Sequence, residues 1–353
     1  MAKTLVVVRL LVGVVIATAR TPVRLILDTD IGGGGCMDVD DVAAICLANA
    51  LADNGEAVLL AVVQNTSPPP CAGAISVLNN YYGRDEVPIG AYKGTDLSPD
   101  AKYLSYVTDL SDNWPSSIKN SSQVPSSVEV YRRVLAEQPD HSVTISSIGL
   151  LTNLAALLSS PPDQVSPLSG AELVARKVAS LVVMGGKYPT SGTSPECNFC
   201  GCYNGATIAD SATASAASGY VFSHIPPEVK ILFSGFEIGI AVQSGGKLSS
   251  CAPASNPCRQ AFIDFEGGPG RSRFSWDPLN TLVAVRGAAA ASCAECTDCD
   301  GSNKVDGASG NNAWVPGAAA NQTYLVLRNA TAAGNAIDEL LCQQPVAKKT
   351  KRS

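Results

Sequence analysis

Four aspartates, the pairs Asp28/Asp30 and Asp40/Asp41, form a group that could hold a metal ion. Asp28 and Asp30 end a run of β-forming residues, and the pair Asp40-Asp41 opens an apolar pattern typical of a helix. Carboxylates this close together repel one another unless a cation lies among them, and a hard divalent cation with oxygen ligands meets that need. The strand, the glycines at residues 32–35 and the helix follow in the order found at the carboxyl end of a strand in α/β folds, where ligands bind.

Four further polar segments stand at the ends of predicted strands or at the start of a helix. They are Val63-Gln64-Asn65, the turn at residues 148–153, Met184-Gly185-Gly186 followed by Glu196-Cys197-Asn198, and Trp276-Asp277. The turn at residues 148–153 could offer a main-chain carbonyl. Polar groups that gather at one edge of a parallel sheet make a site, whereas scattered groups would make only a surface.

Strand-like and helical segments alternate along the chain, which predicts an α/β fold with a mainly parallel open sheet and helices on both faces. We expect strands at residues 25–27, 58–63, 143–147, 178–184 and 229–233. We expect helices at residues 42–52, 72–82, 128–136, 151–158, 208–218, 279–285 and 335–342. Residues 98–122 are expected to form a long surface connection, and residues 291–316 are expected to be irregular.

Composition and charge narrow the class of protein. The 353 residues are 46% hydrophobic and 16% charged, which excludes a disordered chain and allows a large core. The net charge of −6 argues against nucleic acid polymers as partners. We expect a single domain over residues 21–345, followed by a basic tail at residues 346–353 that is frayed and solvated.

The first 20 residues are predicted to be a signal peptide. Lys3 precedes the apolar segment at residues 5–19, which ends in the small residues Ala17-Thr18-Ala19. This segment is too short to span a membrane, and no later stretch is long and apolar enough, so we expect no membrane partner. The alternative is a first buried strand. Glycosylation motifs at Asn120, Asn321 and Asn329 fit a secreted, extracellular glycoprotein, whereas a fourth, at Asn65, lies too close to the expected site.

Twelve cysteines, an even number, are typical of an oxidising compartment. They cluster at Cys197, Cys200 and Cys202, at Cys251 and Cys258, and at Cys293, Cys296 and Cys299. We expect disulfides, and Cys36 in the acidic loop could pair with one of the clusters. Zinc binding by the last cluster is the alternative, although no histidine lies near it.

The motifs, taken in order, resemble those of the inosine/uridine-preferring nucleoside hydrolases, whose hallmark is an aspartate-rich strand end followed by an Asp-Asp pair that opens a helix. The matching segments are Leu27-Asp28-Thr29-Asp30-Ile31-Gly32, Val39-Asp40-Asp41-Val42-Ala43, Ile148-Gly149-Leu150-Leu151-Thr152-Asn153, Val182-Val183-Met184-Gly185-Gly186, Glu196-Cys197-Asn198-Phe199 and Trp276-Asp277. The resemblance runs from about residue 23 to residue 342. It implies a Rossmann-like fold, hydrolysis of the N-glycosidic bond of ribonucleosides to free base and ribose, and a homodimer or homotetramer.

The resemblance also implies roles for individual residues. The ligands of a calcium ion (Ca2+) would be Asp30, Asp41, the main-chain carbonyl of Ile148 and Asp277, with substrate hydroxyls and water completing the coordination. Asp30 would act as the general base. The groups that hold the ribose would be Asp40, Asn65, Glu196 and Asn198, with Met184 packed on the sugar. This acidic wall would stabilise an oxocarbenium-like ribosyl cation.

Several of these residues have plainer alternatives. Asp28 could only orient its neighbours through hydrogen bonds, and Asp38 could be a solvated loop residue or one that supports its neighbours. Asn153 could start a helix without touching a ligand. Met184 could be plain core.

Two features depart from the family pattern. Nine residues separate Asp30 from Asp40, more than in the family's shortest loops, so the glycine-rich segment must bulge without moving the carboxylates. Some members carry a histidine just before the last calcium aspartate, whereas this chain has Trp276 there, and neither His141 nor His224 lies near the motif. A tryptophan at this position resembles the purine-specific branch, in which aromatic stacking helps the base to leave. Filling of the core is the alternative role for Trp276.

Two other functions would fit part of the pattern. A haloacid dehalogenase-type phosphatase also uses an Asp-x-Asp strand end, but its second acidic motif lies far downstream and no phosphate-binding loop is evident here. A secreted protein that binds nucleosides or ribose without turnover would keep the same ligands. Ribose release from nucleosides would separate an enzyme from such a binder.

Overall fold

The computed structural model describes residues 21–32, 38–97, 105–203, 206–207, 210–317 and 321–346. The predicted signal peptide, Cys36 and most of the basic tail lie outside the described residues.

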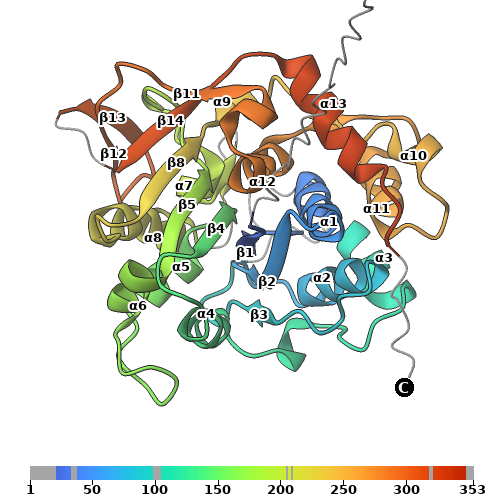
Figure 1. The fold of residues 1–353 in the computed structure, drawn as a ribbon, viewed down its shortest axis with the longest axis horizontal. Coiled ribbons are helices and arrows are strands. Elements are labelled where there is room, and N and C mark those ends of the chain that lie inside the picture. The colour runs from blue at the N-terminus through green and yellow to red at the C-terminus, as the bar shows by residue number, and fades with distance from the viewer. Residues whose placement is uncertain are drawn as a thin grey trace, which may run out of the picture.

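An eight-stranded sheet forms the centre of the molecule, with the strand order β11-β14-β8-β5-β4-β1-β2-β3 (Figure 1). Every pairing in it is parallel except that of β11 with β14. The strands are β1 (Val23–Thr29), β2 (Ala57–Gln64), β3 (Ile89–Ala91), β4 (Val143–Ile148), β5 (Val178–Met184), β8 (Lys230–Ser234), β11 (Cys293–Glu295) and β14 (Gln322–Leu327). The predicted mainly parallel sheet is confirmed.

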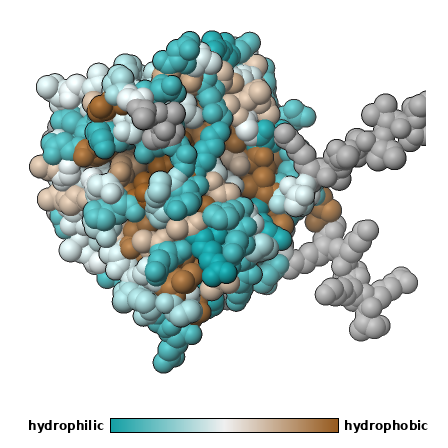
Figure 2. All heavy atoms as spheres, turned by 60° about the vertical axis from the view of Figure 1, so that its left-hand side comes forward, coloured by the Kyte–Doolittle hydropathy of each residue, from teal (hydrophilic) through white to brown (hydrophobic). Residues whose placement is uncertain are grey.

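Helices cover both faces of the sheet, as predicted. Because side chains alternate along a strand, Leu25 and Leu27 of β1 enter one buried cluster and Ile26 enters the other. The first cluster includes side chains of α1 (Asp40–Asp53), α2 (Pro70–Tyr81), α11 (Pro257–Glu266), α12 (Trp276–Arg286) and α13 (Ala330–Leu341). The second includes side chains of α4 (Ser127–Ala136), α5 (Thr152–Leu158), α6 (Gly170–Lys177) and α8 (Ser211–His224). On the face drawn in Figure 2, much of the brown hydrophobic surface lies between teal hydrophilic side chains.

Two segments differ from the expectation. Residues 291–316 are not irregular, because they contain β11 and a hairpin of β12 (Gly301–Val305) and β13 (Asn312–Pro316). Within the expected surface connection, α3 (Ser105–Asn113) forms and packs against α2 and α11. These elements are short and polar, so their sequence pattern is weak and tertiary contacts decide their structure. Helix α13 begins at Ala330, earlier than expected, because the side chain of Asn329 caps it.

Four disulfides join cysteines of the described chain: Cys46–Cys258, Cys251–Cys342, Cys200–Cys202 and Cys296–Cys299. The first two link α11 and α10 (Leu248–Cys251) to α1 and to the end of α13. The zinc alternative is wrong, because Cys296 and Cys299 are bonded to each other. Disulfides in this number are typical of proteins outside the cytosol. In the part of the chain that the structure describes, no helix is both long and apolar enough to cross a membrane.

Candidate active site

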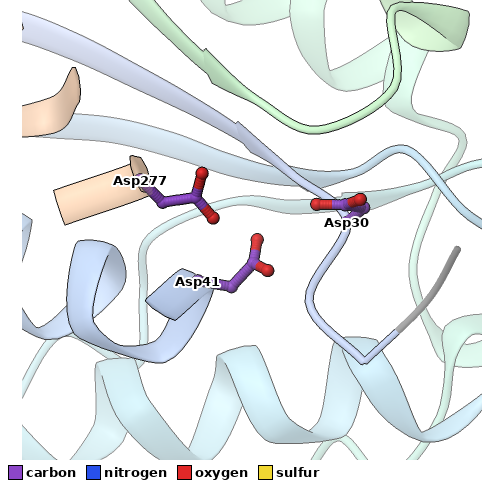
Figure 3. Close-up of side chains that lie close together, drawn as sticks. All are labelled: Asp30, Asp41 and Asp277. Atoms are coloured by element: carbon purple, nitrogen blue, oxygen red, sulfur yellow. The ribbon is translucent and has the colours of Figure 1, made fainter. Parts of the chain in front are cut away.

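Three aspartates from distant parts of the chain meet at the carboxyl edge of the sheet (Figure 3). Asp30 follows β1, Asp41 lies in the first turn of α1, and Asp277 lies in the first turn of α12. One carboxylate oxygen from each lies within 4.8 Å of the others, and all three side chains are buried. Helices α1 and α12 pack side by side, which brings their first turns together. The nine-residue spacing after Asp30 therefore does not separate these carboxylates.

The end of β4 lies directly beside Asp30. Strands β1 and β4 pair in a register that places Thr29 opposite Ile148. A Cβ atom on Gly149 would lie 2.6 Å from the main-chain nitrogen of Asp30 and 2.7 Å from its Oδ1. Only glycine therefore fits at residue 149 without displacing the aspartate. Ile148, whose carbonyl is the fourth predicted ligand, lies at the end of β4 beside the end of β1, and its role stays a prediction.

The electrostatics of this centre call for a cation. Burial raises the pKa of Asp30, Asp41 and Asp277 well above the usual range, and repulsion by neighbouring carboxylates raises each pKa further. The hydroxyl of Thr29 donates to Asp41, but Oδ2 of Asp30 is buried with no hydrogen-bond partner in the described structure. Hard, buried carboxylate oxygens with an unused acceptor are a donor set that suits Ca2+.

Two further acidic residues, at the start of α1 and just before it, are buried. Oδ2 of Asp40 accepts a hydrogen bond from the main-chain nitrogen of Asp277 at 3.0 Å. Asp38 is 3% exposed and forms an ion pair with Arg273, whose Nε lies 2.7 Å from Oδ1. Of the two expectations for Asp38, solvation is wrong and support of its neighbours agrees with the structure.

Asp28, two residues before Asp30, orients its surroundings through hydrogen bonds. Oδ2 accepts from the hydroxyl of Tyr131 at 2.7 Å, and Oδ1 accepts from the amides of Asn65 and Asn153, both at 3.0 Å. Burial raises the pKa of Asp28 to about 7, although these three hydrogen bonds lower it in part. Asn153 also donates a hydrogen bond to the main-chain carbonyl of Gln64, so its amide links the start of α5 to β1 and to the end of β2.

The amide of Asn65 is likewise engaged within the protein. Its nitrogen bonds Asp28, and its oxygen accepts from the main-chain nitrogen of Leu150 at 3.2 Å. Asn65 is fully buried, so its glycosylation motif is closed in the folded protein. The predicted contact of Asn65 with ribose stays a prediction.

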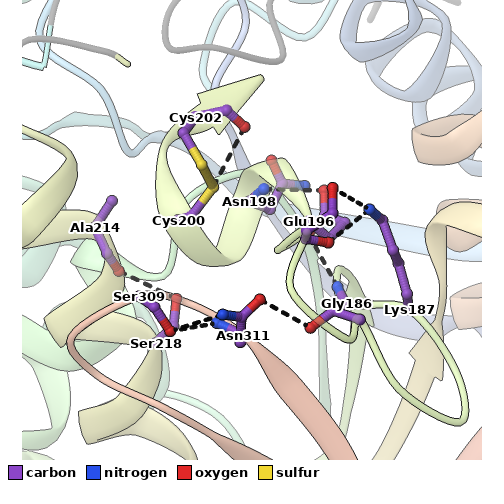
Figure 4. Close-up of a disulfide and its surroundings, with 12 residues drawn as sticks. Gly186, Lys187, Glu196, Asn198, Cys200, Cys202, Ala214, Ser218, Ser309 and Asn311 are labelled. Atoms are coloured by element: carbon purple, nitrogen blue, oxygen red, sulfur yellow. Dashed lines mark hydrogen bonds between the residues drawn. A yellow bond between two sulfur atoms is a disulfide. The ribbon is translucent and has the colours of Figure 1, made fainter. Parts of the chain in front are cut away.

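The segment after β5 folds back so that Glu196 binds the strand end (Figure 4). Glu196 caps the short helix α7 (Cys197–Cys200), where Oε1 accepts from the main-chain nitrogen of Asn198, while Oε2 accepts from that of Gly186, both at 2.9 Å. Burial raises the pKa of Glu196 to about 7, because it outweighs these hydrogen bonds. The negative charge of Glu196 also raises the pKa of Asp30.

Two more predicted residues lie next to Glu196. The amide nitrogen of Asn198 donates to the carbonyl of Met184 at 3.1 Å. Its Oδ1 is buried and has no hydrogen-bond partner in the described structure. Met184 is 4% exposed and belongs to a core cluster, which agrees with the plainer alternative.

Trp276 belongs to an aromatic cluster beside Asp277. Its ring stacks on Phe236 and meets Phe274 edge-on, with centroids 5.3 Å apart in both cases, and its Nε1 donates to the carbonyl of Phe236 at 2.9 Å. The side chain is only partly buried. Both histidines lie at the other edge of the sheet, because His141 precedes β4 and His224 ends the helix that leads to β8.

The sequence patterns did not point to three residues of this neighbourhood. Tyr131, which bonds Asp28, was only part of a predicted helix. Tyr106 lies in a segment expected to be a loop. Arg273, which pairs with Asp38, stands three residues before Trp276, and this closeness to a recognised motif was the only available signal.

The fold and the site together define a class of protein: an α/β enzyme with an acidic centre at the carboxyl edge of a parallel sheet. The family model described as inosine-uridine preferring nucleoside hydrolase matches residues 25–201, half of the chain. The chain therefore belongs to this family of enzymes, which hydrolyse the N-glycosidic bond of nucleosides. This membership contradicts the alternative that the chain is a haloacid dehalogenase-type phosphatase.

Solved structures of the same fold agree with this assignment. A plant nucleoside hydrolase shares 18% identity at a TM-score of 0.62, with coverage of 91% of this chain and 99% of that one. A purine-preferring ribonucleoside hydrolase from Gardnerella vaginalis shares 16% identity at a TM-score of 0.60, with coverage of 90% and 98%. The type III effector XopQ, complexed with adenosine diphosphate ribose, shares 17% identity at a TM-score of 0.59, with coverage of 92% and 93%. No curated protein sequence matches the chain.

Proposed function

We propose that the protein is a calcium-dependent hydrolase of ribonucleosides, with a preference for purine nucleosides, and that it releases free base and ribose. One observation carries the proposal: three buried carboxylates from three elements converge within 4.8 Å. Family membership supports the type of reaction.

The residues that would hold the calcium ion are Asp30, Asp41, Asp277 and the main-chain carbonyl of Ile148. When bound, the ion supplies positive charge that offsets the carboxylates and lowers the pKa of the attacking water. Asp30 would take the proton of that water on Oδ2, the oxygen with no partner in the described structure. The backbone at Gly149 packs against Asp30 and fixes its direction.

Acidic and amide groups around the same edge would bind the sugar. Glu196 and Asp40 supply negative charge close to Asp30, which stabilises a ribosyl cation as it develops. The unpartnered Oδ1 of Asn198 is an acceptor for a ribose hydroxyl. Asn65 and Met184 would line the sugar on its other sides.

The partly buried ring of Trp276, next to Asp277, supports the preference for purines. A stacked aromatic ring favours the larger base and stabilises it as it accepts a proton. A histidine acid is not available there, since both histidines of the chain lie at the opposite edge of the sheet.

The test is a nucleoside panel with ribose release as the readout. We expect wild type to hydrolyse inosine and guanosine faster than uridine and cytidine in calcium. Asp30→Asn should stay folded and lose about 10²- to 10⁴-fold in kcat, the usual contribution of a general base. The exposed Asp112→Asn is the control and should keep full activity. Retained hydrolysis by Asp30→Asn would refute the assigned base.

A binder without turnover is the second candidate, and one comparison favours it: XopQ, an effector with the same fold, is complexed with adenosine diphosphate ribose. Nucleoside binding by calorimetry without ribose release from any member of the panel would establish that candidate.

We also propose that the protein is secreted as a single-domain glycoprotein that forms homodimers or homotetramers. The four disulfides support an oxidising compartment. Asn321 and Asn329 are exposed and Asn120 is partly exposed, so a glycan could reach each of these motifs.

A further inference from the structure

One buried hydroxyl group ties the two ends of the segment between Asp30 and Asp40. The hydroxyl of Tyr106, on α3, accepts a hydrogen bond from the main-chain nitrogen of Gly32 at 2.9 Å and donates to the carbonyl of Asp38 at 2.6 Å. Tyr106 is fully buried. Gly32 follows Asp30 by two residues, and Asp38 precedes Asp40 by two. The hydroxyl of Tyr106 therefore holds the main chain in place close to both aspartates.

Packing fixes Tyr106 and Gly32 in place. The ring of Tyr106 meets Phe265 of α11 edge-on, with centroids 5.8 Å apart. Gly32 adopts a positive φ of 61°, and a Cβ atom there would lie 2.6 Å from Val107. Residue 32 is therefore confined by the neighbour of Tyr106 as well as by its hydroxyl.

Arg273 ties the same segment to the third aspartate. Its Nε lies 2.7 Å and 2.6 Å from the two carboxylate oxygens of Asp38. Arg273 belongs to β10 (Arg273–Phe274), four residues before Asp277, whose main-chain nitrogen binds Asp40. Two contacts, Arg273 to Asp38 and Asp277 to Asp40, therefore run in parallel between the start of α12 and the start of α1.

We propose that Tyr106 and Arg273 are positioning residues of the metal centre. They hold Gly32 and Asp38 at a fixed spacing, so that Asp30 and Asp41 face Asp277 before a cation binds. Without a cation the three carboxylates repel one another, and the two ties keep them together. A site that is already assembled binds its ion more tightly, because ordering of the ligands costs less on binding. This inference rests on the proposed calcium site.

The experiment measures calcium affinity of the full chain by titration calorimetry and by terbium luminescence. Tyr106→Phe removes only the hydroxyl, and we expect the Kd for calcium to rise at least tenfold. Tyr82→Phe is the matched control: Tyr82 is buried, its hydroxyl has no hydrogen-bond partner in the described structure, and the Kd should not change.

A second pair of variants tests the ion pair. Arg273→Met should also raise the Kd at least tenfold, and Arg273→Lys should restore part of the affinity. Arg286→Met is the control, because Arg286 forms a similar two-contact ion pair with Glu56 at the other end of α12 from Asp277. The arginine variants keep the test decisive if Tyr106→Phe does not fold.

Melting temperatures separate positioning from plain stabilisation. Positioning predicts that the rise in Tm on adding calcium shrinks in Tyr106→Phe and Arg273→Met. Variants that lower Tm equally with and without calcium, and keep Kd within threefold of wild type, would overturn this inference but would leave the proposed metal site standing. A wild-type protein that binds neither calcium nor terbium would overturn the proposed metal site itself.

Discussion

Replacement of Glu196 by glutamine should change how stability depends on pH. Glu196 is 2% exposed, and burial raises its pKa from 4.5 to about 7. One pKa unit corresponds to about 1.4 kcal/mol, so the rise in the pKa of Glu196 from 4.5 to about 7 represents ~3 kcal/mol of unfolding free energy. Two main-chain N–H groups hold the carboxylate in place, but they do not offset its loss of hydration.

The sign of this pH dependence follows from proton binding. The folded protein holds the Glu196 proton more tightly than the unfolded chain does. The stabilising contribution is therefore complete below pH 4.5 and is lost as the pH rises through 7. Glutamine does not titrate. Between pH 4 and pH 8, the unfolding free energy of wild type should fall by ~3 kcal/mol relative to Glu196→Gln.

The assay is urea unfolding of both proteins without added calcium across this pH range. Other carboxylates titrate in both proteins, so the difference between the two proteins reports the charge of Glu196, including its repulsion of Asp30. Glu172→Gln is the control of opposite sign, because hydrogen bonds from Ser169 lower the pKa of that exposed glutamate. A difference between wild type and Glu196→Gln that stays constant with pH would show that burial does not control the charge of Glu196.

Two further substitutions test the geometry of the site. Gly149→Ala places a methyl group within 2.7 Å of Asp30, so we expect weaker calcium binding and lost ribose release, whereas Gly317→Ala, with open space around it, should leave both unchanged. Equal calcium affinity in Gly149→Ala and wild type would contradict the packing argument. Trp276→Ala removes the stacking surface and should lower kcat/KM for inosine by about 10- to 100-fold, from ~1–3 kcal/mol of stacking. The loss for uridine should be smaller, and an equal loss for both nucleosides would show that Trp276 does not select the base.

Local sequence determined the framework. Buried parallel strands are continuous hydrophobic runs, so β1, β2, β4, β5 and β8 could be read directly, and β5 matches its predicted bounds. Because parallel strands end at one edge, the polar residues after them were predicted to meet. Asp30, Asp41 and Asp277 do meet, although residue 277 lies far along the chain.

Tertiary structure decided what supports that edge. Tyr106 lies in a segment with no strong period, and its hydroxyl acquires its role only when α3 packs near the loop. The pairing of Cys46 with Cys258 and the sheet position of β11 likewise depend on contacts between distant segments. Hydrophobic period is a property of neighbouring residues, so sequence alone determined the main strands and helices and the edge of the sheet that carries the acidic residues. Hydrogen bonds, ion pairs and disulfides depend on three-dimensional distance, so only the folded chain decided how those acids are held.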